Sequence, residues 1–119
     1  MEPFAINIEK ETVANKFYRR ILYTTPLMQL VLMTLAPKEY IPFEVHTGDQ
    51  FVHVEKGHAY VEIKDTGEYY DLKDGDSIII PMGYEHFIGN PGKAPLKIYT
   101  LYTPPQHSPY EEPQYDQPE

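Results

Sequence analysis

The chain has 119 residues and a net charge of −8, from 18 acidic and 10 basic residues. This length predicts one domain, and the negative charge argues against nucleic acid or an anionic membrane as a partner, since both require a basic face. The absence of cysteine excludes disulfides, thiolate metal sites and a cysteine nucleophile. No apolar run approaches the roughly 18 residues of a membrane span. Residues 1–4 show no basic and apolar leader, so we expect a cytoplasmic protein.

Turn signals recur along the chain and separate short runs rich in Val, Ile, Tyr and Phe. This rhythm predicts an all-β protein, an antiparallel sandwich or barrel. Before the first strand, residues 10–16 are expected to form one short helical turn, and no segment has the length and period of a longer helix. The predicted strands cover residues 17–24, 27–36, 41–46, 50–56, 58–64, 68–73, 77–81, 84–89 and 95–103.

Two of these strands, 27–36 and 95–103, are apolar on both faces. A strand of this kind must be covered on both sides. The barrel interior provides one cover, and the other is expected to come from an N-terminal strand or from a second subunit. We therefore predict a homodimer.

The barrel domain is assigned to residues 1–103, with its core at about 27–103, and residues 104–119 form a proline-rich, acidic C-terminal tail. Proline cannot donate a hydrogen bond to a sheet ladder. The tail is therefore expected to be extended or disordered, and to lie over the barrel or over a partner.

One polar side chain is predicted to face the barrel interior. Side chains alternate between the two faces of a strand, so placing Val52 and Val54 inside carries Gln50 inside with them. A buried amide requires partners, and a metal ion or a hydrogen-bond network would satisfy it.

Three further donor side chains, Glu44, His46 and His86, could join Gln50 at one metal ion. Glu44 and His46 are two residues apart on the strand at 41–46 and therefore point the same way. Gln50 follows across a tight turn, and His86 lies on a later strand that can pass over the same interior point of a small barrel. Imidazole, carboxylate and amide oxygen suit a divalent Fe, Mn, Ni, Co, Cu or Zn ion. Two histidines and one carboxylate are also the donor set of non-haem iron oxygenases.

A second interpretation of the strand at 41–46 stays open. Three apolar residues alternate with Glu44 and His46, so the strand could instead turn the apolar set inward and leave Glu44 and His46 in water. The apolar set is Ile41, Phe43 and Val45. His86 taken alone fits a surface or hydrogen-bonded core role, and Gln50 taken alone carries little information. The joint pattern of the four residues favours a metal site.

The other histidines are assigned away from this site. His53 and His58 face outward on their strands, and His107 lies in the tail as a solvated or docking residue. Asp49 is expected to point away from Gln50 and to stabilise a turn rather than bind the metal.

The four candidate ligands lie in two motifs that resemble those of the cupin superfamily. The first family motif has Gly, His-x-His, Glu and Gly. Here Glu44-Val45-His46 stands at the His-x-His position, Gln50 at the Glu position and Gly57 at the end, while the leading Gly is missing. The second family motif has Gly, Pro-x-Gly, His and Asn, and this sequence matches all of it. The matching residues are Gly75, Pro81, Gly83, His86 and Asn90.

The resemblance covers residues 27–103 and implies the cupin double-stranded β-helix, a jelly-roll barrel with a metal inside. The sequence is similar to the small single-domain cupins of the mannose-6-phosphate isomerase-like type, which commonly form dimers. The resemblance implies that His46 and His86 are metal ligands, with Gln50 beside them and Glu44 in place of a histidine.

This site predicts a metal-dependent enzyme that acts on a small polar substrate, which would be a carbonyl, enediol or sugar-derived compound. The reaction would be an oxygenation, or an isomerase or lyase reaction, and Glu44 could leave the metal to act as general base. The alternative is a non-catalytic module that binds a sugar or small acid around a structural metal.

Overall fold

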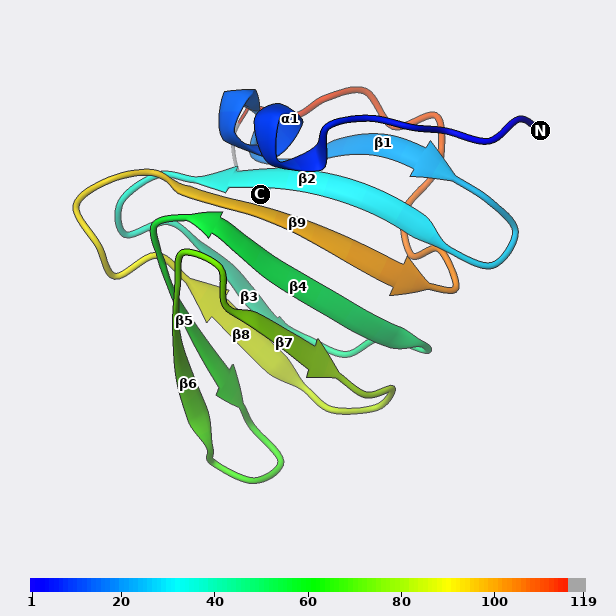
Figure 1. Ribbon diagram of the computed structural model, residues 1–119. Coiled ribbons are helices and arrows are strands. Elements are labelled where there is room, and N and C mark those ends of the chain that lie inside the picture. Colours follow the sequence, from blue (N-terminus) through cyan, green and yellow to red (C-terminus); the bar gives the residue numbers. More distant parts are fainter. Residues whose placement is uncertain (116–119) are drawn as a thin grey trace.

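The computed structural model describes residues 1–115, which form one short helix and nine strands (Figure 1). Every strand expected from the sequence is present, and its ends lie within three residues of the expected bounds. In chain order the elements are α1 (Ile8–Ala14), β1 (Arg20–Thr24), β2 (Gln29–Leu35), β3 (Tyr40–Glu44), β4 (Asp49–Lys56), β5 (His58–Ile63), β6 (Tyr69–Lys73), β7 (Ser77–Ile80), β8 (His86–Gly89) and β9 (Leu96–Thr103).

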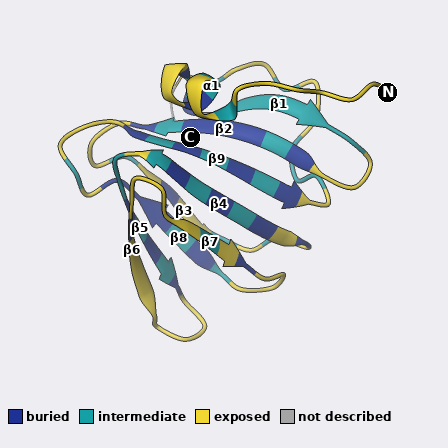
Figure 2. Ribbon diagram, in the orientation of Figure 1, coloured by how far each residue is buried: buried dark blue, intermediate teal, exposed yellow. Residues whose placement is uncertain are grey.

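The strands form two antiparallel sheets that enclose the core. One sheet has the order β1-β2-β9-β4-β7, and the other has the order β3-β8-β5-β6. This confirms the expected all-β jelly-roll. Figure 2 shows buried residues alternating along β4 and β9, as expected of strands that turn one face to a common interior. Val52 and Val54 are fully buried, and Gln50 shares their inward face and is 2% exposed.

The N-terminal helix differs from the expectation of one turn at residues 10–16. The helix α1 has seven residues and begins earlier, because Asn7 caps it: the Asn7 side chain accepts a hydrogen bond from the backbone N–H of Lys10 at 3.0 Å. Asn15 ends the helix in an extended conformation. Thr12 is the one buried residue of α1, so the sequence has no apolar stripe of helical period from which the helix could be predicted. Within residues 1–115, no helix is long and apolar enough to span a membrane.

The outer face of β2 and β9 is covered in part by the chain's own N-terminal segment. Lys97 of β9 donates through Nζ to the backbone carbonyl of Asn15, which follows α1. Asn15 in turn donates through Nδ2 to Oγ1 of Thr34 on β2. Leu32, on the same outer face as Thr34, is fully buried. The outer cover at this point is the segment that follows α1 rather than the expected N-terminal strand, because β1 joins the edge of the same sheet. The homodimer stays a prediction.

Residues 104–115, which we call the strap, run from the end of β9 back over the barrel. Backbone hydrogen bonds join Arg19 to Gln114 in an isolated antiparallel bridge, and Phe17 packs against Tyr115. The rest of the tail assigned from the sequence, residues 116–119, lies outside the described residues.

Candidate metal centre

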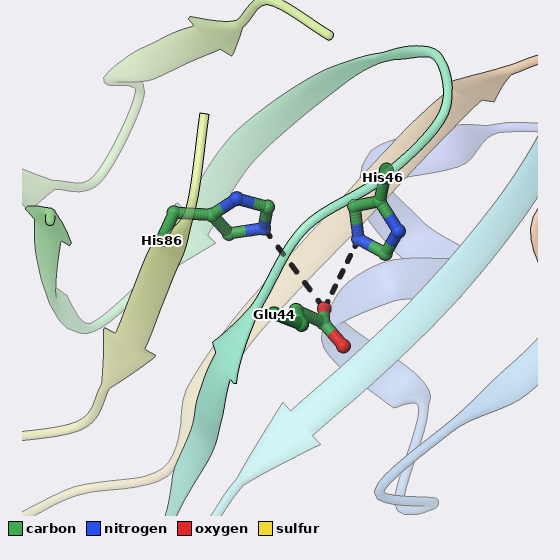
Figure 3. Close-up of side chains that lie close together, drawn as sticks. All are labelled: Glu44, His46 and His86. Carbon is green, nitrogen blue, oxygen red and sulfur yellow. Dashed lines mark hydrogen bonds and ion pairs between the residues drawn. The ribbon is translucent and has the colours of Figure 1, made fainter. Parts of the chain in front are cut away.

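The side chains of Glu44, His46 and His86 meet inside the barrel. Glu44, the last residue of β3, pairs directly with His86, the first residue of β8. Oε1 of Glu44 lies 3.1 Å from Nε2 of His46 and 3.9 Å from Nε2 of His86 (Figure 3). One donor atom from each residue lies within 4.8 Å of the other two, so the three side chains could hold one metal ion.

A local irregularity in β3 explains why these polar side chains face inward. The pairing of β3 with β8 shifts register between Ile41 and Glu44, and such a bulge breaks the alternation of faces. Ile41 is 7% exposed, whereas Phe43 and Val45 are 39% and 56% exposed. The interpretation in which all three apolar residues face the core is therefore wrong. The expected strand at 41–46 is also too long, because β3 ends at Glu44 and His46 lies in the turn that follows.

The hydrogen bond that His86 makes leaves the lone pair of its Nε2 available to bind a metal ion. Nδ1 of His86 lies 3.0 Å from the carbonyl oxygen of Tyr84, and since a carbonyl only accepts, Nδ1 carries the proton. Nε2 then bears the lone pair, and within residues 1–115 it has no hydrogen-bond partner. Burial lowers the pKa of His86, against the opposing effect of the bond to Tyr84. The imidazole is therefore neutral at neutral pH, which is the form that binds a metal.

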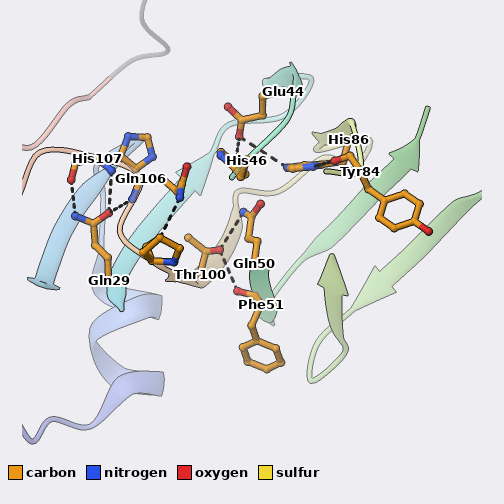
Figure 4. A network of polar contacts seen from close by, with 11 residues as sticks. Gln29, Glu44, His46, Gln50, Phe51, Tyr84, His86, Thr100, Gln106 and His107 are labelled. Atoms are coloured by element: carbon orange, nitrogen blue, oxygen red, sulfur yellow. Dashed lines mark hydrogen bonds and ion pairs between the residues drawn. The ribbon is translucent and has the colours of Figure 1, made fainter. Parts of the chain in front are cut away.

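The orientation of Gln50 follows from its neighbour Thr100 on β9. The Thr100 hydroxyl donates to the carbonyl oxygen of Phe51 at 3.0 Å, so toward Gln50 it can only accept. Its partner at 3.0 Å is therefore Nε2 of Gln50, which leaves Oε1 facing away from Thr100. Figure 4 shows the amide end of Gln50 directed toward Glu44 and His46. Oε1 is buried and has no hydrogen-bond partner among the described residues.

The Glu44 carboxylate is the most accessible of the three clustered donors. Its side chain is 35% exposed, compared with 10% for His46 and 1% for His86. Burial alone would raise the pKa of Glu44, but the hydrogen bond to His46 and the electrostatic interactions with His46, His86 and His107 outweigh this effect and lower the pKa. Glu44 is therefore ionised at neutral pH.

The turn before β8 holds the backbone of His46. The N–H of Gly83 donates to the carbonyl oxygen of His46 at 3.2 Å, and Gly83 has a φ of 91°, a conformation that favours glycine. Asp49 accepts a hydrogen bond from the N–H of Met82 in the same turn at 2.9 Å. Asp49 thus stabilises a turn, as expected, although the turn is that of the second motif rather than its own.

Asn90, the last residue of the second motif, has a structural role. It is 2% exposed, and its Nδ2 donates to the carbonyl oxygens of Leu35 and Ala94, both at 2.9 Å. It closes the loop between β8 and β9 from the inside. Of the residues of the second motif, His86 alone offers a donor atom to the cluster.

The outward histidines remain away from the cluster. The two ring nitrogens of His53 contact Ser77 and Glu55, and a ring nitrogen of His58 lies 3.1 Å from Asp71. These partners account for both side chains on the outer surface of the barrel.

Two nearby residues were missed by reasoning from the sequence. Tyr102 of β9 pairs with Gln50, is 2% exposed, and places its ring 5.1 Å from the ring of His46. Thr100 and Tyr102 carry hydroxyls on an inner face of β9 that is otherwise apolar, and these hydroxyls were the available signal. The two faces of that strand could not be assigned from the sequence.

A separate cavity of about 310 Å³ opens between the edges of β6 and β7. Its lining is mostly apolar and includes Ile78, Ile80 and Tyr70. Since none of the four candidate ligands lines this cavity, the candidate metal centre lies elsewhere.

The fold and the cluster agree with the comparisons to known proteins. Residues 31–102 match the family described as the cupin domain, so the chain belongs to the cupin family. The solved structure of BH2720 from Bacillus halodurans superposes with a TM-score of 0.90 at 37% identity, over 96% of this chain and 89% of that one. The resemblance seen in the two motifs is thus confirmed at the level of the family.

Two curated relatives are similar over most of the chain. The uncharacterized protein L612 of Acanthamoeba polyphaga mimivirus is 44% identical over 114 residues, which are 91% of this chain and 69% of that protein. The uncharacterized protein YrkC of Bacillus subtilis (strain 168) is 34% identical over 111 residues, 89% of this chain and 60% of that protein. The chain therefore spans about two thirds of these relatives.

Proposed function

We propose that the chain is a metal-dependent enzyme that binds one divalent transition metal ion through Glu44, His46, Gln50 and His86. The observation that carries this proposal is a pair of buried, unpartnered donor atoms, Oε1 of Gln50 and Nε2 of His86. An unpaired buried polar atom costs roughly 1–3 kcal/mol. A metal ion bound between them would remove that cost, and imidazole, carboxylate and amide oxygen suit Fe, Mn, Ni, Co, Cu or Zn.

The proposed substrate is a small polar molecule, such as a carbonyl, enediol or sugar-derived compound. A bound ion would supply Lewis acid chemistry, and with iron it would also supply oxygen chemistry. Glu44 is ionised and is the clustered donor most open to solvent, so it is placed to accept a proton from a substrate beside it. These features support oxygenation, or isomerase or lyase chemistry, in which Glu44 is the general base.

The alternative function is a non-catalytic module that binds a sugar or small acid around a structural metal. The two proposals differ in whether the metal ion keeps a coordination position that no protein atom occupies. A structural site is closed by protein donors, whereas a catalytic site keeps a position for water or substrate. The exposure of the Glu44 carboxylate supports the catalytic proposal.

The test begins with elemental analysis of the purified protein and continues with chelator-stripped protein reloaded with each of the six metals. Oxygen uptake and product formation are then measured with 1,3-diketones, enediols, thiols and sugar acids. Turnover of one class, with the bound metal exchanging in the presence of a chelator, is the expected result. A tightly held, non-exchanging metal with no turnover would favour the binding module. A chain that binds no metal would overturn both.

A further inference from the structure

His107 of the strap lies beside the candidate metal centre, although the two are far apart in the sequence. Its ring packs edge-on against the ring of Tyr102, with centroids 5.3 Å apart. The other neighbour of Tyr102 is His46, whose ring lies 5.1 Å away. Burial lowers the pKa of His107, and Glu44 and His46 are among the ionisable neighbours that contribute smaller effects.

The buried side chain of Gln29 fixes the backbone of the strap at His107. Oε1 of Gln29 accepts from the N–H groups of Gln106 and His107 at 3.2 and 3.0 Å, and Nε2 donates to the carbonyl oxygen of His107 at 2.7 Å (Figure 4). Nε2 also donates to Oγ1 of Thr24, so Gln29 is fully engaged. A fully buried glutamine that makes four such bonds is a specific anchor for this point of the chain.

A second anchor holds the strap further along. Nε and Nη2 of Arg19 donate to the two carboxylate oxygens of Glu111, both at 2.8 Å, and both side chains are less than one fifth exposed. A bidentate pair of this kind fixes orientation as well as distance. The strap is therefore held at His107 itself by Gln29 and again at Glu111 by Arg19.

The His107 imidazole is left free by these anchors. The anchors use only its backbone, and among the described residues no hydrogen bond reaches either ring nitrogen. His107 is also not one of the donors within 4.8 Å of one another, so it is not placed as a metal ligand. A half-buried imidazole in this position can donate one hydrogen bond to a molecule bound next to Glu44 and His46.

We propose that the strap is part of the binding site, and that His107 is a substrate-binding residue which donates a hydrogen bond to an oxygen of a small acid or carbonyl compound at the metal centre. This inference rests on the proposed metal-dependent function and adds to it a recognition group supplied by the C-terminal tail. In this proposal Gln29 and Arg19 are positioning residues, which hold His107 in place without contacting the substrate.

The test uses the full chain loaded with Co(II) and oxalate as the probe. Cobalt content is measured by elemental analysis, and oxalate affinity is measured from the visible absorption of the bound Co(II). We expect His107→Ala to keep one cobalt per chain and to weaken oxalate binding about tenfold. His107→Gln, which retains an N–H donor, should recover part of the affinity. His58→Ala, which changes a histidine on the outer surface, should bind oxalate like the wild type.

The outcomes separate this inference from the proposed function. Equal oxalate affinity in wild type and His107→Ala would overturn the role of His107, as would a cobalt-loaded wild type that binds no oxalate. Loss of cobalt from a folded His107→Ala would also overturn it, since His107 would then serve the metal rather than the substrate. A wild type that binds no cobalt would refute the proposed function itself.

Discussion

The hydroxyl of Thr100 determines which end of the Gln50 amide faces Glu44 and the two histidines. Its single proton goes to the carbonyl oxygen of Phe51, so it must accept from Nε2 of Gln50, and Oε1 is left for the cluster. Thr100 offers no atom to the proposed metal ion, but it thereby determines which atom of Gln50 is available as the proposed donor.

Thr100→Val should therefore weaken metal binding. Valine keeps the volume but cannot accept from Gln50, so the amide loses its fixed orientation. We expect the dissociation constant for Co(II), measured by isothermal titration calorimetry, to rise about tenfold, which corresponds to one lost hydrogen bond of about 1.4 kcal/mol. Thr34→Val, which removes a hydroxyl on the outer face of β2, is the control and should leave the constant unchanged. Equal affinity in both variants would contradict the role of Thr100.

Glu44→Gln tests the proposed general base. The amide can still offer an oxygen to the metal but cannot take up a proton, so the variant should retain metal and lose turnover. General-base catalysis contributes about 10²–10⁴-fold, and we expect a loss of at least about a hundredfold in kcat. The measurements are metal content and steady-state kinetics with the substrate found in the panel. Full activity would show that another group takes the proton, and complete loss of metal would leave Glu44 as a ligand only.

The metal-free protein should lose stability as the pH falls below about 6.5. Burial lowers the pKa values of His86 and His107 from the ordinary 6.5 in the folded state. As the pH falls, the histidines of the unfolded chain therefore bind protons before those of the folded chain. The contribution of the two histidines to the free energy of unfolding is complete above pH 6.5 and declines as the pH falls toward the folded pKa values. We expect Tm to decrease between pH 6.5 and 5. In His86→Gln this decrease should be smaller, and an identical decrease would rule out His86 as its source.

Glu111→Gln should loosen the strap and leave the barrel folded. The charged, bidentate bond to Arg19 is lost, and bonds to charged groups contribute about 1.5–3 kcal/mol. Hydrogen exchange should show faster exchange of the backbone N–H of Gln114, which donates to the carbonyl oxygen of Arg19, with little change in β4 and β9. Glu112→Gln, the neighbouring acidic residue in the strap, is the matched control. Unchanged exchange at Gln114 would show that the ion pair does not hold the strap.

The homodimer predicted from the sequence can be placed on the outer face of the five-stranded sheet. Phe51, His53 and Tyr99 form a cluster of rings on β4 and β9, and Ile79 of the neighbouring strand β7 is 68% exposed. Light scattering should give twice the mass of the chain, and Ile79→Asp should shift it toward the monomer. Tyr69→Asp, which changes a similarly exposed residue on the opposite sheet, should not. A monomeric wild type would refute the prediction.

The sequence was sufficient for the strands and for the inward position of Gln50, because regular alternation needs only local information. It was not sufficient for β3, where a bulge between Ile41 and Glu44 breaks that alternation and turns Glu44 inward. The helix α1 was misjudged because its signal is the cap at Asn7 rather than an apolar stripe.

The contacts of the strap could not be predicted from the sequence. His107 meets Tyr102, and Gln29 meets the backbone of His107, through contacts that depend on the path of the whole chain. A single histidine in a proline-rich tail carries no local sign of such a neighbour. The two motifs, by contrast, contain Glu44, His46 and His86, whose donor atoms lie within 4.8 Å of one another.

The binding of a metal ion by these donors is tested most directly by titrating chelator-stripped protein with Co(II) and following both heat and visible absorption. Wild type should bind one ion per chain, and His86→Ala should lose this binding while His58→Ala, which changes a histidine on the outer surface, retains it. No binding by a folded wild type, or equal binding by His86→Ala, would contradict the assignment of Glu44, His46, Gln50 and His86 as a metal centre.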